Sequence, residues 1–416
     1  MLLLSAPAHA QLRGHGGPVR AVAVSGDGKT AVSGSFDTSA IRWSLERDTA
    51  EQVLRFHDTA VNAVTMLPDG RVATASQDGR IGVWRAGEDR PGTVYEGHQA
   101  PVVALAVSRD GRTLASASWD RTVRLWPLGG GEPRVLEGHE GNVNGVAFTP
   151  DGRAVVSAGY DLTIRIWPLD GGSPTVATLP TPVASVTVAP DGEIVAGGAD
   201  GTVYFLSPAG ELRDQLKAHP APLIAVAVSG DGKLAAAAGI QSSIWIIDRG
   251  ARTIVRTLTG RGLPVWSAAF LPDSRTLITG GADRTVRRWN ALTGEEIGMT
   301  TAAGAEDPLA AHAGDRGAEV YRACVACHTL TADSGNSAGP TLAGIFGRRI
   351  ATLPGYNFSP ALKQLDIVWT PETVSRLFEI GPAAYTPGTK MPEQRIGSVE
   401  DREALVRFLE KATRPR

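Results

Sequence analysis

Hydrophobic and polar residues alternate in short runs through about the first three hundred residues, and the same pattern returns at a regular spacing. Each unit contains a run such as PVRAVAVS, a turn such as SGDGK, a run such as KTAVSGS, an Asp-containing turn into a run such as TVRLW, and a looser segment. Alternating β-branched residues between Asp- and Gly-rich turns are typical of short antiparallel strands. The pattern therefore predicts four strands in each unit.

The units recur every 39 to 42 residues, measured between equivalent positions of the third run. Self-similarity at this period is the signature of a repeat architecture, in which each unit buries its apolar face against its neighbours. There are seven units, marked in order by Trp43, Trp84, Trp126, Trp167, Leu206, Ile247 and Trp289.

Residues 11–303 resemble WD40 repeats, a family marked by a Gly-His pair, a Ser or Thr, a loop Asp and a strand Trp. The resemblance implies an all-β, seven-bladed propeller in which these four side chains form a hydrogen-bonded chain across a blade. It rests on the period and the quartet, because no Asp follows the Trp directly. Full quartets occur in four units: His15, Ser33, Asp37, Trp43; His57, Thr74, Asp78, Trp84; His98, Ser116, Asp120, Trp126; and His139, Ser157, Asp161, Trp167.

The last three units depart from the quartet, so we expect them to depend more on apolar packing. Five of the eight histidines fall in quartet positions, and we interpret these as structural rather than as metal ligands or catalytic groups. The departures are Leu179, Ala196 and Leu206 in the fifth unit, His219 with Ala237, Gln241 and Ile247 in the sixth, and Arg261 with Thr279, Asp283 and Trp289 in the seventh.

A closed propeller needs a strand from one end of the domain to complete the blade begun at the other end. Two segments could supply this strand, His9–Gly14 and Glu295–Thr301. Cleavage of a leader after Ala10 would shorten the first segment and favour the second. Beyond the repeats, residues 304–314 are rich in Ala and Gly without a sustained period, which predicts a linker.

Composition excludes several classes of protein. The 41 basic and 43 acidic side chains give a net charge of −2, so there is no basic footprint for nucleic acid or an anionic membrane surface. No run approaches the roughly 20 apolar residues that span a bilayer. At 416 residues the chain is long enough for two folded units.

Residues 1–10, MLLLSAPAHA, end in the A-x-A element of a secretory signal peptide. A basic segment and a full apolar segment are missing in front, so a misplaced start codon or a fortuitous arm are the alternatives. Together with the cysteine motif described next, this segment predicts an exported, periplasmic protein.

The only two cysteines, Cys324 and Cys327, belong to the run CVACH, which ends at His328. Two thiols at this spacing can add to the two vinyl groups of a haem, and the adjacent histidine then meets the iron. A zinc site would need two further ligands, of which only His312 lies outside the propeller, and a thioredoxin-like motif would need a βαβ unit. The motif therefore predicts one covalently attached haem c.

The iron needs a second axial ligand or an open position. The only methionine of the C-terminal segment is Met391, which lies 63 residues after His328. A methionine by itself is more often a core residue than a ligand. A thioether ligand would raise the reduction potential.

Residues 315–416 resemble class I cytochromes c, a small all-α fold, in CVACH, GPTLAGIFGRR, the Trp369 region, YTPGTKMP and a final amphipathic helix. The resemblance implies that His328 and Met391 are the axial ligands and that the Pro340 carbonyl accepts a hydrogen bond from His328. It also implies that Arg348 and Trp369 hold a haem propionate, and that Thr389 and Lys390 support the Met391 loop.

Three positions depart from that family. Phe358 replaces a propionate-binding tyrosine, Phe378 replaces a tyrosine near the methionine, and Ala383 with Ala384 replaces a lysine pair. The haem edge is therefore expected to be less basic, with different docking partners. Local patterns predict helices capped by Thr370 and Ser398, the second packing on the first helix of the domain.

These features predict a periplasmic single-electron carrier rather than an enzyme, with the propeller docking redox partner proteins. The alternative is a propeller–haem oxidoreductase with a substrate or cofactor site in the propeller funnel, similar to quinohaemoprotein dehydrogenases or haem nitrite reductases. WD40-type repeats, the lack of adjacent cysteines and the absence of a propeller histidine outside the quartet positions disfavour it. A redox sensor is a third possibility without sequence support.

Overall fold

The computed structural model describes residues 11–219, 221–240, 243–259, 264–297, 309–322, 324–325, 328–331, 339–354, 356, 358–389, 391 and 395–414. The expected signal segment 1–10 and residues 304–308 of the expected linker lie outside the described residues. So do Gln241, Arg261, Cys327 and Lys390.

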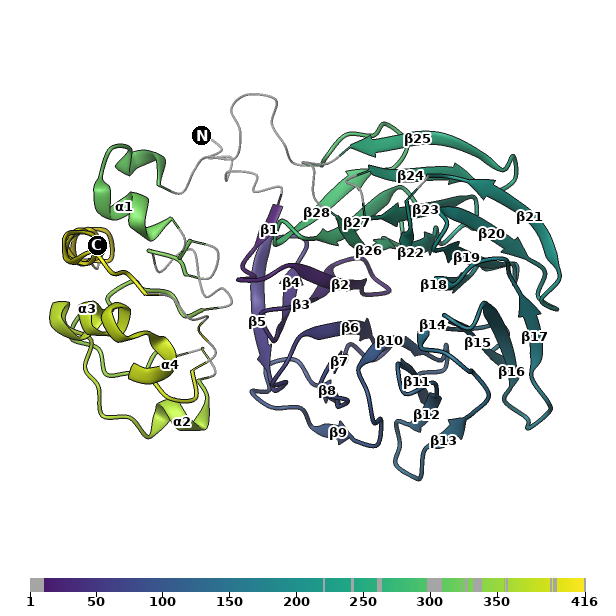
Figure 1. Cartoon of the computed structure of the whole chain (residues 1–416), viewed down its shortest axis with the longest axis horizontal. Coiled ribbons are helices and arrows are strands. Elements are labelled where there is room, and N and C mark those ends of the chain that lie inside the picture. The colour runs from purple at the N-terminus through teal and green to yellow at the C-terminus, as the bar shows by residue number, and fades with distance from the viewer. Residues whose placement is uncertain are drawn as a thin grey trace, which may run out of the picture.

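Seven four-stranded antiparallel sheets form a ring, which is the predicted propeller (Figure 1). Blades 1 to 3 comprise β2 (Val19–Val24), β3 (Thr30–Ser35), β4 (Ser39–Ser44), β5 (Thr49–Arg55); β6 (Val61–Met66), β7 (Val72–Ser76), β8 (Ile81–Trp84), β9 (Thr93–Tyr95); and β10 (Val102–Val107), β11 (Thr113–Ser118), β12 (Val123–Pro127), β13 (Arg134–Leu136).

Blades 4 to 7 repeat the same order of strands along the chain. They comprise β14 (Val143–Phe148), β15 (Ala154–Gly159), β16 (Thr163–Pro168), β17 (Thr175–Thr178); β18 (Val183–Val188), β19 (Ile194–Gly198), β20 (Thr202–Leu206), β21 (Leu212–Lys217); β22 (Leu223–Val228), β23 (Leu234–Gly239), β24 (Ser243–Asp248), β25 (Thr253–Thr259); and β26 (Val265–Phe270), β27 (Thr276–Gly281), β28 (Thr285–Asn290) with β1 (Gln11–Arg13).

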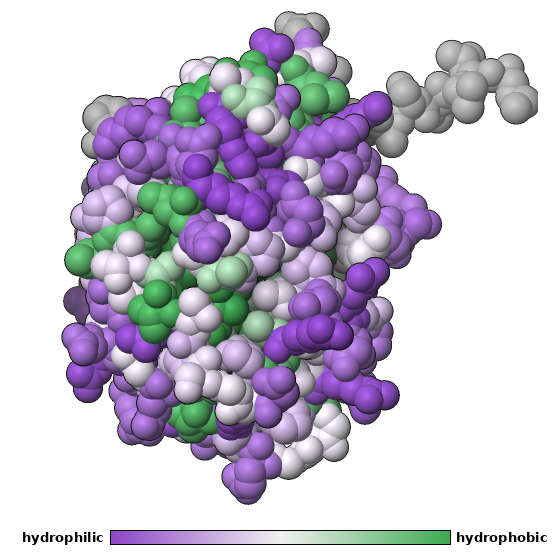
Figure 2. Space-filling view, turned by 90° about the vertical axis from the view of Figure 1, so that its right-hand side faces the viewer, coloured by the Kyte–Doolittle hydropathy of each residue, from purple (hydrophilic) through white to green (hydrophobic). Residues whose placement is uncertain are grey.

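Apolar side chains of neighbouring blades pack against each other. Val32 and Leu54 of blade 1, for example, share a buried cluster with Val61 and Trp84 of blade 2. The outermost strands carry fewer buried residues, and β21 has none. Figure 2 shows the edge of the ring away from the helices, where hydrophilic side chains surround smaller hydrophobic patches.

The N-terminal segment closes the ring. Strand β1 pairs with β28, with Leu12 opposite Val286, and it begins immediately after Ala10. The second candidate also adds to this edge further along β28, because the Ile297 N–H donates to the Arg288 carbonyl and Glu296 forms a bridge with Trp289. The two candidates therefore occupy successive parts of one outer edge instead of competing for it.

The quartets of blades 1 to 4 form the hydrogen-bonded chains that the resemblance implies. In blade 1, His15 Nε2 lies 2.7 Å from the Ser33 hydroxyl and Nδ1 lies 2.9 Å from Asp37, while the Trp43 indole donates to the same hydroxyl at 2.7 Å. Burial raises the pKa of Asp37, but the charge and hydrogen bond of His15 outweigh burial, so the pKa lies well below its ordinary value. The carboxylate therefore stays ionised.

In two later blades other side-chain contacts replace the quartet, and the sequence pattern did not reveal them. In blade 5 the Tyr204 hydroxyl donates to Asp200 at 3.0 Å. In blade 6 His219 does not complete a quartet. It stacks on Trp245 with ring centroids 4.7 Å apart and accepts a hydrogen bond from the Ala221 N–H at 2.8 Å.

The C-terminal segment folds as a small helical unit beside blade 1 (Figure 1). Asp315 caps α1 and Ser398 caps α5, while the Thr370 side chain forms a capping box at the start of α3. No helix in the described part of the chain is long and apolar enough to cross a membrane. The elements are η1 (Ala310–His312), α1 (Arg316–Tyr321), α2 (Pro360–Lys363), α3 (Pro371–Ile380), α4 (Pro382–Tyr385) and α5 (Val399–Ala412).

Helices α1 and α5 pack closely at the core of this unit. Tyr321 and Phe408 lie with ring centroids 5.5 Å apart, and both side chains are buried. A Cβ on Gly317 would lie 2.1 Å from the Ala404 carbonyl, so only glycine allows this approach. The crossing anchors the segment that leads into the cysteine motif.

Candidate functional site

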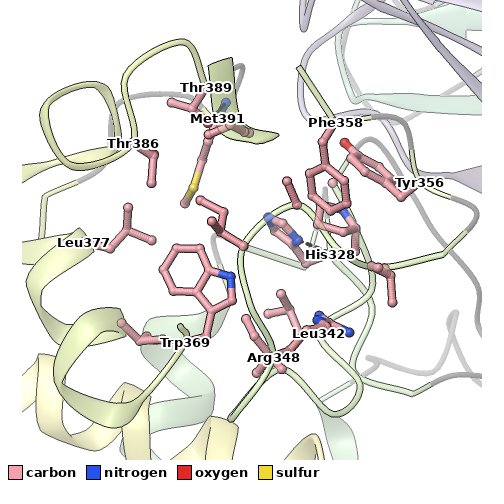
Figure 3. Close-up of a pocket in the computed structure, with 18 of the residues that line it drawn as sticks. His328, Leu342, Arg348, Tyr356, Phe358, Trp369, Leu377, Thr386, Thr389 and Met391 are labelled. Carbon is pink, nitrogen blue, oxygen red and sulfur yellow. Dashed lines mark hydrogen bonds between the residues drawn. The ribbon is translucent and has the colours of Figure 1, made fainter. Parts of the chain in front are cut away.

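A cavity lined mainly by apolar side chains lies within the helical unit and reaches the edge of the propeller. It brings together segments that are far apart in the sequence, including Cys324 and His328 after α1, Trp369 before α3, and Met391 after α4. Figure 3 shows the His328 ring and the Met391 side chain projecting into the same space.

The backbone around the motif fixes the orientation of His328. Its Nδ1 donates a hydrogen bond to the Pro340 carbonyl at 2.8 Å, the pairing that the family resemblance implies. No hydrogen bond reaches Nε2 from the described residues. Burial lowers the pKa of His328, the Pro340 contact raises it and the Arg55 charge lowers it, with a net decrease. A neutral imidazole with an open nitrogen is suited to bind a metal.

Gly339 lets the chain pass directly against the His328 ring. A Cβ at this position would lie 2.3 Å from Cε1 of His328, which is closer than any atom can approach. A side chain at residue 339 would therefore move the ring or the loop. The cradle that holds the imidazole depends on this glycine.

A tight turn presents Met391 to the cavity. The Thr389 hydroxyl accepts a hydrogen bond from the Met391 N–H at 3.1 Å, and the Thr389 N–H donates to the Thr386 carbonyl at 3.0 Å. Gly388 adopts a φ of 79° at this turn, a conformation that favours glycine. Thr389 thus supports the methionine loop through its hydroxyl.

Arg348 and Trp369 both line the cavity and are joined by the backbone, because the Trp369 N–H donates to the Arg348 carbonyl at 3.0 Å. The Arg348 guanidinium is already engaged by its own loop, with Nη1 donating to the Ala343 carbonyl at 3.0 Å and Nη2 to the Thr341 carbonyl at 3.1 Å. Burial lowers the pKa of Arg348. Two of its nitrogen atoms therefore already donate to carbonyl groups of the protein.

The sequence analysis missed several residues of the lining, among them Tyr356, Asp37 and Arg55. Tyr356 packs against Phe358 with ring centroids 4.7 Å apart, and Asp37 and Arg55 reach the cavity from blade 1. The sequence predicted Asp37 only as a quartet residue and gave no role to Arg55, because nothing in the repeat pattern indicates which blade lies beside the helical unit.

These features fit a haem. The cavity holds a buried thiol at Cys324, an imidazole with an open nitrogen, and a thioether on a separate loop, within an apolar lining. Imidazole and thioether are the axial donors to the haem iron in cytochromes c. A glycine cradle and a carbonyl acceptor orient the imidazole.

Comparison with known families agrees with both halves of the fold. The profile of "WD domain, G-beta repeat" matches residues 8–44, 49–85, 89–127, 130–168, 174–206 and 252–290, more than half of the chain. The chain therefore belongs to the WD40-repeat family. The matches leave out residues 207–251, which include strands β22 to β24 of blade 6, where the quartet is lost but four strands remain.

The profile "Cytochrome c" matches residues 314–413. Cytochromes c of the fungus Cochliobolus lunatus and the plant Arabidopsis thaliana are each 40% identical over 100 residues, which is 24% of this chain and 92% and 88% of those proteins. A cytochrome c of Gibberella zeae is 36% identical over 100 residues, 24% of this chain and 93% of that protein. The C-terminal segment is a cytochrome c domain, and its cofactor is covalently attached haem c.

Proposed function

We propose that the protein is a periplasmic, monohaem electron carrier that exchanges single electrons with partner proteins docked on its propeller. Cys324 and Cys327 attach the haem, and His328 and Met391 are its axial ligands. The observation that carries the proposal is the pairing of the open His328 Nε2 with the Met391 thioether in one apolar cavity. Pro340, Arg348, Trp369 and Thr389 complete the set of haem-binding residues.

A haem with one imidazole and one thioether ligand would exchange single electrons at its iron, and the thioether would raise its reduction potential. Residues of the chain orient the two ligands. The Pro340 carbonyl fixes the His328 ring, and the turn at Thr389 presents Met391. The apolar lining limits access of water to the cavity, which favours electron transfer over reaction with small molecules.

The propeller has a surface suited to a protein partner. Large apolar side chains precede the turn aspartate, or its equivalent position, in blades 1, 3, 4 and 6. Because the positions are equivalent, they belong to the same face of the ring. The residues and their exposed fractions are Phe36 45%, Trp119 40%, Tyr160 50% and Ile240 47%.

We call the surface formed by these four residues the aromatic face, since three of them are aromatic. It adjoins the haem cavity, because Asp37, the neighbour of Phe36, lines that cavity. Aromatic residues are enriched at protein interfaces. A partner bound to the aromatic face would therefore lie beside the haem domain. This supports a docking role in electron transfer.

Electron-transfer assays on a captured partner test the function. The full-length protein, matured with haem in the periplasm, serves as bait for redox proteins from the source cells, and each captured protein is mixed with it in a stopped-flow spectrometer. We expect rapid one-electron reduction or oxidation that slows in the Phe36→Ser and Trp119→Ser double variant. Equal rates in both proteins would contradict docking on the aromatic face.

Two other outcomes would contradict the proposal. Turnover of a small substrate by the purified protein would favour the alternative of an enzyme with a site in the propeller funnel. Retention of the haem protein in the cytoplasmic fraction, with an intact residue 1 at its N-terminus, would contradict export.

A further inference from the structure

The propeller contributes a cation to the haem cavity. Arg55 is the last residue of β5, the outer strand of blade 1, and β5 faces the helical domain in Figure 1. It pairs with Ser39 in the sheet, which places it next to the turn that carries Asp37. Both Asp37 and Arg55 line the cavity that holds His328 and Met391.

The Arg55 guanidinium forms no salt bridge with a carboxylate among the described residues. Its Nε is buried without a hydrogen-bond partner, and its Cζ lies 5.5 Å from the centroid of the Tyr356 ring. Burying donors of a charged group without acceptors is costly. The contact with an aromatic face offsets only part of that cost.

Asp37 lies close enough to Arg55 for a charge interaction, but its oxygens are hydrogen-bonded within blade 1. Oδ2 lies 2.9 Å from His15 Nδ1 and accepts from the Gly16 N–H at 2.8 Å. Oδ1 accepts from the Ser39 N–H at 2.9 Å and the Ser39 hydroxyl at 2.6 Å. The quartet thus satisfies Asp37 and leaves Arg55 available to a ligand in the cavity.

The cytochrome domain offers the haem fewer free hydrogen-bond donors than the family resemblance implies. Arg348 donates from Nη1 and Nη2 to loop carbonyls, and Phe358 lacks the hydroxyl of the tyrosine it replaces. A haem carries two propionate carboxylates, and guanidinium groups bind carboxylates by paired hydrogen bonds. Arg55 has the chemistry and the position to fill this role.

We propose that Arg55 binds a haem propionate, so that the propeller completes the haem site and raises its reduction potential. A positive charge near the haem disfavours the ferric state, which carries one more positive charge than the ferrous state. The pairing also keeps the propionate ionised over a wide pH range. The inference rests on the proposed placement of the haem between His328 and Met391.

Spectroelectrochemical titration of the full-length haem protein tests the role of Arg55. In Arg55→Gln we expect the equilibrium constant for haem reduction to fall about tenfold, which is about 59 mV for a one-electron couple. The propionate should then titrate near neutral pH, so that the potential falls as pH rises, whereas the wild-type potential should change little. Arg55→Lys keeps the charge and should stay closer to wild type.

Arg124→Gln is the matched control. Arg124 is another propeller arginine that has a buried Nε without a partner and lies over an aromatic ring, with Cζ 5.9 Å from the Trp126 centroid, but it does not line the cavity. We expect it to leave the potential unchanged. An unchanged potential and pH profile in Arg55→Gln, or equal shifts in Arg55→Gln and Arg55→Lys, would overturn the proposal.

The two proposals fail separately. A wild-type haem protein without the methionine-to-iron absorption band would contradict the axial pair. A wild-type protein with that band whose potential is insensitive to Arg55→Gln would contradict only the role of Arg55.

Discussion

Each domain orients a histidine through its Nδ1, but the two rings differ at Nε2. In blade 1, Asp37 engages Nδ1 of His15 and Ser33 engages Nε2, so the ring is part of a closed network. In the cytochrome domain, Pro340 engages Nδ1 of His328, and Nε2 faces a cavity without a partner from the described residues. A histidine with both nitrogens occupied stabilises a fold, whereas one with a free nitrogen can bind a ligand.

Replacing one histidine of each kind by glutamine gives the largest expected effect. His328→Gln should remove the low-spin haem spectrum, because the amide replaces the imidazole that meets the iron, and should leave the thermal unfolding of the propeller unchanged. His139→Gln, in blade 4, should lower the unfolding temperature of the propeller and leave the haem spectrum unchanged. Visible absorption and calorimetry on the two variants measure this, and a normal haem spectrum in His328→Gln would break the comparison.

Met391→Leu should keep the covalently attached haem but abolish the methionine-to-iron band and lower the reduction potential, since leucine offers no donor to the iron. The control is Met66→Leu, a volume-conserving change of a methionine buried in the propeller, which should leave band and potential intact. Persistence of the band in Met391→Leu would refute the ligand assignment.

Gly339→Ala tests how tightly the open histidine is held. The added Cβ would meet the His328 ring, and overpacking of this kind costs about 1–3 kcal/mol. We expect weaker axial binding, seen as a high-spin component in the absorption spectrum. Gly397→Ala is the control, since no atom lies within 4 Å of a Cβ there. Identical spectra for both variants would show that the cradle is not needed.

Ser157→Ala tests the closed network in blade 4, where the hydroxyl contacts both His139 and Trp167. Loss of this shared partner should lower the free energy of unfolding by about 1–3 kcal/mol without changing the haem spectrum. Thr279→Val in blade 7 should cost less, because Thr279 accepts only the Trp289 indole among the quartet positions described there. Denaturant unfolding of both variants gives the two values, and a larger cost in blade 7 would contradict this ranking.

Acid should destabilise the hydrogen-bonded quartets of the propeller. Burial raises the pKa of Asp161, but the hydrogen bonds from Thr163 and His139 outweigh burial, so this pKa is lowered overall. Burial also lowers the pKa of His139. A depressed pKa in the folded state means that the unfolded state binds more protons, so stability falls as pH drops below about 6.5 for His139 and about 3.9 for Asp161.

Melting temperatures of the propeller between pH 8 and about pH 2 measure this effect, which we expect to be the smallest of the series. Asp161→Asn should remove the loss of stability that its carboxylate causes below about pH 3.9. A melting temperature that rises on acidification would reverse the assigned sign.

Much of the fold was predictable because its determinants are local and repeated. The period of the strand tryptophans predicted seven four-stranded blades, and short strands are specified by alternation along a few residues. Likewise, Cys324 and His328 lie within one turn of chain, so their chemistry is visible in the sequence. The caps at Thr370 and Ser398 are equally local, and the structure contains both.

The sequence by itself determined the units: the number of blades, the quartet residues and the haem motif, all of which depend on near neighbours in the chain. Tertiary structure decided the contacts between distant segments. These include the closure of the ring by β1, the meeting of His328 and Met391 in one cavity, and the approach of Arg55 to that cavity. Such contacts depend on which surfaces pack together, and no periodicity within one segment encodes that choice.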